Sequence, residues 1–300
     1  MLIYRPKNGE VLPDFLYSHI CSHGAQQWLE ARAKKTSGQQ NLTIQLGKEL
    51  PINLPPLPEQ RKIADILSTW DAAIEKTEAL LATAKAQKRA LMQSLLTGKR
   101  RFPEFEGQPW KEVRIGDIAR EVSERNKDDA ALTVISCTKT IGFVNSLDYF
   151  KKKVFSDDLS GYKIIRRNQI GYPSNHVEEG SIGIQNLHDA ALVSPIYTIF
   201  ETRPEVDPMY LFRVLKTDRY RQIFAAATSA SVDRRGSLRW KAFATIKVRL
   251  PSLHEQQRIN EALSVADNEI SELESSVAKL RTEKKALMQQ LLTGKRRVVL

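Results

Sequence analysis

The sequence predicts an α+β protein in which two long helices pair with each other. Two observations carry this prediction: a segment of 48 residues occurs twice, and each copy has the length and spacing of one long helix. The residues between the copies instead show short β-rich runs separated by turn residues. The predicted domains are therefore residues 1–53, 54–101, 102–249 and 250–300, with the long helices in the second and the fourth.

The two copies are a true internal repeat. Residues 54–101 and 250–297 align without a gap at an offset of 196, and 24 of the 48 positions are identical. Each copy begins with Leu-Pro, which keeps the approach extended, and ends with Leu-Leu-Thr-Gly-Lys-Arg-Arg. Gly98 and Gly294 can adopt the left-handed conformation that ends a helix. The roughly 39 residues between these signals predict a rod roughly 55–60 Å long.

Apolar residues in both copies alternate at spacings of four and three, which is the heptad pattern of a coiled-coil seam. The seam residues are Ile63, Leu67, Trp70, Ile74, Leu81, Leu91 and Leu95 in the first copy and Ile259, Leu263, Ile270, Leu273, Val277, Leu280, Leu287 and Leu291 in the second. A helix of this length needs a partner that covers its seam, and the other copy can supply it. Lys88 and Lys284 interrupt the seam at equivalent positions. Either their stems extend to solvent, or the two lysines set the register or contact a partner.

The composition is that of a globular protein with excess positive charge. Hydrophobic residues make up 41%, charged residues 27%, and the formal net charge is +11, which is compatible with a polyanionic partner. No run approaches the roughly 18 apolar residues of a spanning helix, and the start has no signal-peptide pattern. We therefore expect a cytoplasmic protein with no membrane partner. Cys21 and Cys137 cannot build a disulfide framework or a cysteine zinc site, and both are expected to be small buried thiols.

Residues 102–249 predict a compact α+β domain. The expected strands are 133–136, 169–173, 181–184 and 195–200, and a helix is expected over about 207–226. Residues 1–53 match the end of this domain, because Pro13–Tyr17 corresponds to Pro208–Phe212 and Thr36–Leu42 lies where Thr228–Leu238 lies. The repeated unit is thus a domain plus its helix, and the first copy lacks about 90 residues of its start. Such a chain could be a fragment, a truncated gene product, or a chain completed by another polypeptide.

This alternation resembles the specificity subunits of type I restriction–modification enzymes, here as an N-terminally truncated member. The residues that carry the resemblance are the two copies of Leu-Pro, Glu-Gln, the long helix and Leu-Leu-Thr-Gly-Lys-Arg-Arg, and it covers essentially the whole chain. The resemblance implies two target-recognition domains that each read half of a bipartite DNA site. It also implies that the helices pair as an antiparallel coiled coil and fix the spacer between the halves.

The resemblance further implies partners for the chain. It would bind double-stranded DNA, dock methyltransferase and restriction subunits, and have no catalytic activity of its own. S-adenosylmethionine, ATP and magnesium would belong to those partner subunits, and no cofactor or metal would bind this chain. The absent start suggests that another specificity chain or fragment completes the first domain.

The residues agree with a non-catalytic chain. We find no Asn-Pro-Pro-aromatic methylation motif, no Gly-rich cofactor loop and no helicase motif. The repeated Leu-Thr-Gly-Lys is not a phosphate-binding loop, because Gln93 stands where that loop needs glycine and Arg100 where it needs Ser or Thr.

Three basic clusters and two polar segments are candidate DNA contacts. They are Lys151, Lys152 and Lys153; Arg166 and Arg167; Arg234, Arg235 and Arg239 beside Ser229 and Ser231; Asn175 and His176; and Gln39, Gln40 and Asn41. The cations would contact phosphate, and the amides have the chemistry that reads adenine edges. The alternative is that each charge run is a solvated surface. A metal role for His176 is not expected, because no second ligand lies at a useful spacing.

Two hypotheses of another class stay open beside the specificity subunit. The chain could be a coiled-coil protein that docks partners, or a decayed or partial specificity subunit, without independent DNA reading. A stand-alone nuclease is a further alternative, for which no metal-binding carboxylate constellation stands out.

Overall fold

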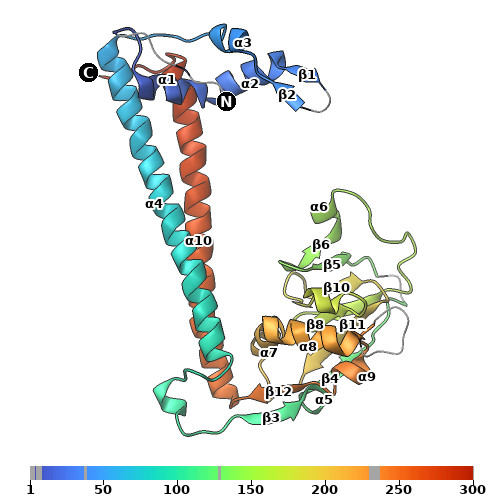
Figure 1. The fold of residues 1–300 in the computed structure, drawn as a ribbon. Coiled ribbons are helices and arrows are strands. Elements are labelled where there is room, and N and C mark those ends of the chain that lie inside the picture. Colours follow the sequence, from blue (N-terminus) through green and yellow to red (C-terminus); the bar gives the residue numbers. More distant parts are fainter. Residues whose placement is uncertain (1–3, 5–8, 37–38, 128–129, 230–236, 300) are drawn as a thin grey trace. The chain divides into compact units, whose positions relative to one another are not determined.

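The computed structural model of the chain describes all residues except 1–3, 5–8, 37–38, 128–129, 230–236 and 300. The described residues fall into two compact units, which we call the first unit (residues 1–88 and 266–300) and the second unit (residues 89–265). Two long helices, α4 (Leu57–Leu95) and α10 (Leu253–Leu292), each contribute residues to both units (Figure 1).

The long helices have the lengths and ends that the sequence predicts. They contain 39 and 40 residues. Gly98 and Gly294 have φ of +71° and +73°, the left-handed conformation that glycine adopts without a steric penalty. Their N–H groups donate to the carbonyls of Leu95 and Leu291, both at 3.2 Å, which caps the last turn in the same way in both copies.

Within the first unit α4 and α10 run antiparallel and are joined by repeated ion pairs. The pairs are Lys85–Glu274 and Glu78–Arg281, each at 2.6 Å, together with Lys88–Asp267 and Asp71–Lys284. An offset of 196 converts each pair into its counterpart on the opposite helix, so the contacts of this unit have a pseudo-two-fold symmetry. The predicted seam residues are all buried or half-buried.

The two seam lysines contact the partner helix. Lys88 and Lys284 have side chains that are 27% and 19% exposed, and each ammonium group binds the aspartate at the equivalent place opposite. Of the two interpretations that the sequence allowed, the structure therefore favours a contact that sets the register. A charge inside a seam has this effect because any shifted pairing would leave it without its partner.

Reversing one of these charges is expected to destabilise the helix pair. Lys284→Asp would place two carboxylates together and lower the free energy of unfolding by about 1 kcal/mol in urea titrations. Adding Asp71→Lys restores the attraction, so the double variant should recover most of the loss. If the double variant lost as much free energy of unfolding as the two single variants added together, the pair would contribute no coupling energy.

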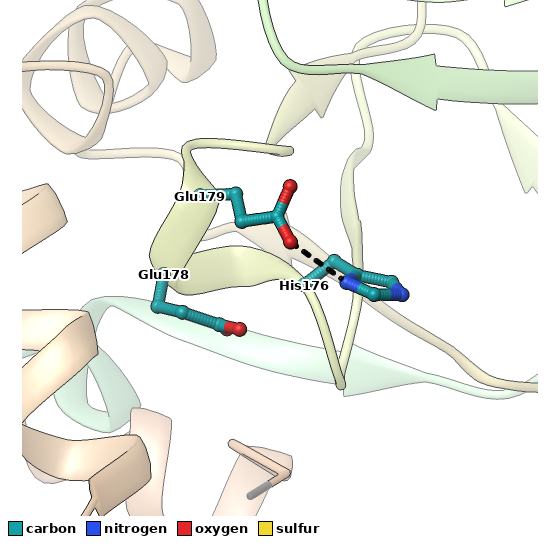
Figure 2. A group of neighbouring side chains, drawn as sticks. All are labelled: His176, Glu178 and Glu179. Carbon is teal, nitrogen blue, oxygen red and sulfur yellow. Dashed lines mark hydrogen bonds and ion pairs between the residues drawn. The ribbon is translucent and has the colours of Figure 1, made fainter.

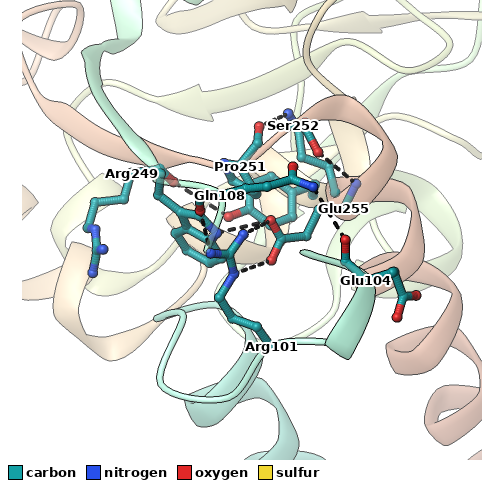
Figure 3. Close-up of polar contacts among 10 residues, drawn as sticks. Arg101, Glu104, Gln108, Arg249, Pro251, Ser252 and Glu255 are labelled. Carbon is teal, nitrogen blue, oxygen red and sulfur yellow. Dashed lines mark hydrogen bonds and ion pairs between the residues drawn. The ribbon is translucent and has the colours of Figure 1, made fainter. Parts of the chain in front are cut away.

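A buried carboxylate begins each long helix and binds the segment that follows the other one. In the second unit, Glu255 is 1% exposed and accepts hydrogen bonds from Arg101 Nε and Nη2 at 2.8 and 2.6 Å (Figure 3). Trp110 Nε1 donates to the same carboxylate at 3.1 Å. The first unit has the equivalent pair, in which Arg297 donates to Glu59 at 2.6 and 2.5 Å. Each helix start is thereby tied to the end of its antiparallel partner.

The second unit contains an antiparallel sheet covered by helices. Its elements are η1 (Pro103–Phe105), β3 (Lys111–Arg114), α5 (Ile115–Ile118), β4 (Ala119–Val122), β5 (Ile135–Thr138), β6 (Gly142–Asn145), α6 (Ser146–Phe150), β7 (Lys163–Arg166), β8 (Ile170–Pro173), η2 (Val177–Glu179), β9 (Gly183–Ile184), β10 (Ala190–Val193), β11 (Tyr197–Thr202), α7 (Pro208–Leu215), α8 (Asp218–Ser229), α9 (Trp240–Phe243) and β12 (Lys247–Leu250). Four strands form the order β4-β11-β8-β9, while β3 pairs with β12, β5 with β6 and β7 with β10. In the four-stranded sheet Ile199 lies opposite Val122 on one side and Gly171 on the other.

Aromatic rings join this sheet to the helices that cover it. Phe200 of β11 lies 5.3 Å from Phe243 of α9, measured between ring centroids, and Tyr172 of β8 lies 4.7 Å from the same ring. Phe224 of α8 completes the group at 5.5 Å from Phe243. Figure 1 shows α7 and α8 across the sheet. Burial of these rings and of Leu211 supplies the main apolar core of the unit.

The expected helix over about 207–226 is two helices, which corrects the prediction. α7 ends at Leu215 and α8 begins at Asp218. Thr217 causes the break, because its hydroxyl donates to the carbonyl of Val214 at 2.7 Å and its own carbonyl accepts from Tyr220 at 3.1 Å. A threonine side chain that competes with the backbone in this way favours a helix boundary over a helix interior.

The described part of residues 1–53 repeats contacts from the end of the second unit. Its elements are α1 (Pro13–Ile20), α2 (His23–Arg32), β1 (Lys34–Thr36), β2 (Gln39–Asn41) and α3 (Ile44–Lys48). Gln60 accepts from Leu12 N at 2.9 Å, and its equivalent Gln256 accepts from Asp207 N at 2.9 Å. Phe15 is fully buried against Ile63, Leu67, Leu291 and Leu292. These contacts support the proposed equivalence of α1 with α7.

Among the described helices, none combines the length and the apolar character needed to cross a membrane.

Candidate nucleic-acid interface

The three lysines of the first basic cluster lie directly after α6. Lys151 has a left-handed φ of 55° and ends the helix, with its N–H donating to Leu147 O at 3.0 Å. Lys151, Lys152 and Lys153 are all exposed. Lys153 pairs with Asp157, and this hydrogen-bonded contact lowers the pKa of that carboxyl. Lys151 and Lys152 form no ion pair with any described residue, so both ammonium groups are available to an external anion.

Arg166 and Arg167 are committed to partners inside the domain. Arg166 donates to Glu124 through Nε at 3.0 Å and Nη2 at 2.7 Å, and this pair raises the pKa of the guanidinium. Arg167 donates to Asp189 Oδ1 at 3.0 Å and to Asn186 O at 2.9 Å. A phosphate would have to compete with these carboxylates, so this cluster is a weaker candidate than the lysines.

The polar loop after β8 lies beside the segment that leads into α9. Leu238 N donates to Ser174 O at 2.8 Å, which brings Asn175 and His176 near the chain segment of Arg239. Asn175 is half-buried, and no described residue bonds to its Oδ1 atom. His176 and Arg239 are exposed. Two of the predicted contact regions are therefore neighbours in the fold although His176 and Arg239 are 63 positions apart in the sequence.

His176 has carboxylates close to it, which corrects the sequence argument that no second ligand is near. Figure 2 shows Glu178 and Glu179 beside the imidazole, and one ligand atom from each of the three residues lies within 4.8 Å of the others. His176 Nδ1 lies 3.2 Å from Glu179 Oε1. Two of the three side chains are exposed, and exposed acidic groups often gather in this way without a metal. The arrangement by itself therefore does not assign a metal site to these three residues.

Several predicted contacts lie outside the described residues. These are Ser231, Arg234 and Arg235. Ser229 is the last residue of α8. Gln39, Gln40 and Asn41 form β2, which pairs antiparallel with β1 so that Gln40 lies opposite Lys35. Their role in reading DNA stays a prediction.

An exposed aromatic pair lies next to the lysines and was not predicted from the sequence. Tyr149 and Phe150 of α6 are 47% and 39% exposed, and their rings lie 4.9 Å apart at an angle of 82°. The signal was present in the sequence as Tyr-Phe-Lys-Lys-Lys. The period of a short helix does not reveal whether such rings face a core or the solvent, so the structure was needed to find them.

The two cysteines differ in environment, which corrects the expectation of two buried thiols. Cys21 is exposed, whereas Cys137 is half-buried and burial raises the pKa of its thiol to about 12. At pH 8 almost none of Cys137 is thiolate, which is the reactive form.

We expect a thiol reagent to modify Cys21 quickly and Cys137 slowly, and Cys21→Ser should remove the fast phase. A fast phase that survives in Cys21→Ser would contradict the assignment.

Residues 2–86 match the family model described as "Type I restriction modification DNA specificity domain". The chain is 24% identical over 322 aligned residues to the type I restriction enzyme MjaVIII specificity subunit of Methanocaldococcus jannaschii, which covers 95% of this chain and 71% of the relative. It is 23% identical to the putative type I restriction enzyme MjaX specificity subunit of the same organism, over 99% of this chain and 71% of the relative.

Two solved structures have a similar fold. One is the HsdS subunit from Thermoanaerobacter tengcongensis, with a TM-score of 0.52, 19% identity, and coverage of 97% of this chain and 73% of that one. The other is the S subunit of a type I restriction–modification system from M. genitalium, with a TM-score of 0.56, 17% identity, and coverage of 94% and 73%. At these identities the likeness shows a shared fold, including the two long helices packed together.

Proposed function

The chain belongs to the specificity subunits of type I restriction–modification systems, and on that premise we propose that it reads a bipartite DNA site while docking methyltransferase and restriction subunits. It is the non-catalytic component that supplies DNA specificity. In this proposal S-adenosylmethionine, ATP and magnesium bind the partner subunits, and the complex works in the cytoplasm. The observation that carries the proposal is the helix pair, whose register is held by the same ion pairs in both copies.

A helix pair with a fixed register is suited to measure distance on DNA. Any slip of α10 along α4 would separate Lys88 from Asp267 and Lys284 from Asp71 together. In this proposal the length of the helix pair sets the separation between two reading domains. Two reading domains with a fixed separation impose a fixed spacing on their half-sites.

We further propose that another polypeptide of the same kind completes the first recognition domain. In the second unit Leu238 is fully buried and Trp240 is half-buried against Phe200 of the sheet. The equivalent residues of the first unit, Leu42 and Ile44, are 46% and 68% exposed. Apolar side chains that are covered in one copy and open in the other support a partner that would supply the corresponding sheet.

Coexpression with the methyltransferase subunits of the same system, followed by mapping of methylated bases, tests the function. We expect methylation at one defined sequence with this chain and no such methylation without it. Two half-sites at a fixed spacing would support bipartite reading, whereas a single or palindromic half-site would contradict it. Methylation by the purified chain alone, with S-adenosylmethionine, would contradict a non-catalytic role. Loss of sequence preference despite a stable complex would favour a protein that only docks partners.

A further inference from the structure

We propose that an exposed surface around α6 contacts double-stranded DNA, with Tyr149 and Phe150 against the bases and Lys151 and Lys152 at the phosphates. We call this surface the α6 patch, and its residues are Leu147, Tyr149, Phe150, Lys151, Lys152 and Val154. The inference rests on the proposed function and adds to it a contact element and a mode of contact. Figure 1 shows α6 at the end of the second unit that lies away from β3 and β12.

The α6 patch is held outward by a fixed attachment. Ser146, the first residue of α6, is fully buried, and its hydroxyl lies 2.8 Å from that of Ser136 on β5. Its N–H donates to Val134 O at 3.1 Å. The residues that follow leave the core: Leu147 is 55% exposed and Val154 is 45% exposed. Single exposed apolar residues are ordinary, but four of them within eight consecutive residues, next to an anchored helix start, are typical of a binding surface.

The aromatic pair has the form of a wedge. The rings of Tyr149 and Phe150 contact each other edge to face, with an interplanar angle of 82°. This contact orients both rings before any ligand arrives, so little side-chain freedom is lost on binding. Apolar and aromatic side chains that enter a DNA groove can press between base steps and bend the duplex.

The flanking charges select a polyanion over a neutral protein surface. The left-handed Lys151 ends α6 directly after the rings, so the cations begin where the aromatic pair stops. Neither Lys151 nor Lys152 forms an ion pair with a described residue, in contrast to Arg166, whose guanidinium binds Glu124 through two hydrogen bonds. Free cations next to exposed rings match the phosphate edge and the bases of one duplex.

Two double variants of the full chain, in the complex with methyltransferase subunits, separate these contributions. Binding would be measured on two duplexes of equal length, one with the mapped methylation target and one with that target scrambled. In Lys151→Gln/Lys152→Gln, both duplexes should bind more weakly. The negative slope of log affinity against log salt should become shallower by about 2 between about 50 and 200 mM salt.

In Tyr149→Ala/Phe150→Ala, the salt slope should stay unchanged while the target duplex binds at least about 10-fold more weakly and is bent less in energy-transfer measurements. The matched control is Leu187→Ala/Ile196→Ala, which removes apolar side chains of similar exposure, 45% and 43%, from the same unit. Thermal unfolding of each variant, compared with the parent chain, confirms that the fold is intact.

Unchanged affinity and salt slope in both double variants overturn the inference while leaving the proposed function in place. Normal DNA binding with loss of the methyltransferase subunits would assign the α6 patch to protein docking and would also overturn it. A parent complex with no DNA preference contradicts the proposed function, and the inference falls with it.

Discussion

Arg101→Ala is expected to lower the free energy of unfolding of the second unit by about 3 kcal/mol, measured by urea titration. The carboxylate of Glu255 is 1% exposed and accepts two hydrogen bonds from Arg101 and one from Trp110. The substitution removes the two from the cation and leaves, among the described residues, only the neutral donor Trp110. A buried charge without a compensating partner is among the costliest defects in a folded protein. Arg101→Lys should recover only part of the loss, because lysine lacks the planar fork that binds both oxygens.

The repeat supplies the matched control. Arg297→Ala removes the equivalent arginine of the first unit, whose side chain is 67% exposed and whose partner Glu59 accepts from no tryptophan among the described residues. We expect a smaller loss there, because solvent can reach and screen the exposed arginine end of this pair. The hydrogen bond from Arg297 lowers the pKa of Glu59, so its contribution is present above the ordinary pKa of a glutamate and is lost as the pH falls through the lowered value. Equal losses in both variants would show that burial does not govern this contact.

A seven-residue insertion in each long helix is expected to lengthen the unread spacer of the DNA target by roughly three base pairs. Seven residues keep the seam in phase and add about 10 Å to the helix pair. Insertions after Ala79 and after Ser275 fall at equivalent positions of the repeat. Ion pairs on each side of these points keep their partners, because α4 and α10 lengthen together. Mapping of methylated bases with the coexpressed methyltransferase measures the spacer.

An insertion in α4 alone is the control for this experiment. It would separate one set of ion pairs from its partners, so a stable complex with a longer spacer is not expected, and methylation should be lost. A spacer that stays unchanged after the paired insertion would contradict the role of the helices in setting distance. Together, the two experiments separate an effect of the length of the helix pair on the spacer from an effect of the stability of the helix pair.

Structure that follows from local and periodic signals was predictable from the sequence. The lengths of α4 and α10, their glycine ends and their mutual pairing all follow from a repeat that carries its own start and stop residues. The β-rich runs at 169–173 and 195–200 correspond to β8 and β11 within a few residues. The helix expected over about 207–226 is divided because Thr217 bonds to the backbone of the preceding turn, a local competition that the apolar pattern does not display.

Contacts between residues that are distant in the sequence could be identified only in the tertiary structure. Arg166 and Lys151 belong to similar charge runs in the sequence, yet Arg166 is bound to Glu124 while Lys151 ends α6 without an ion pair among the described residues. Charge runs show where cations are, but the availability of each cation depends on carboxylates from other segments of the domain. For the same reason the environments of Cys21 and Cys137 were not predictable.

The sequence by itself therefore determined the duplicated helix, its ends and its seam, because a 3.6-residue period and a glycine stop act within a few turns. Only the tertiary structure decided that Lys88 and Lys284 bind aspartates across the pair, and that Tyr149 and Phe150 face outward beside lysines that form no ion pair with a described residue. Those outcomes depend on which distant side chains arrive within a few ångströms. Periodicity along one segment contains no information on that distance.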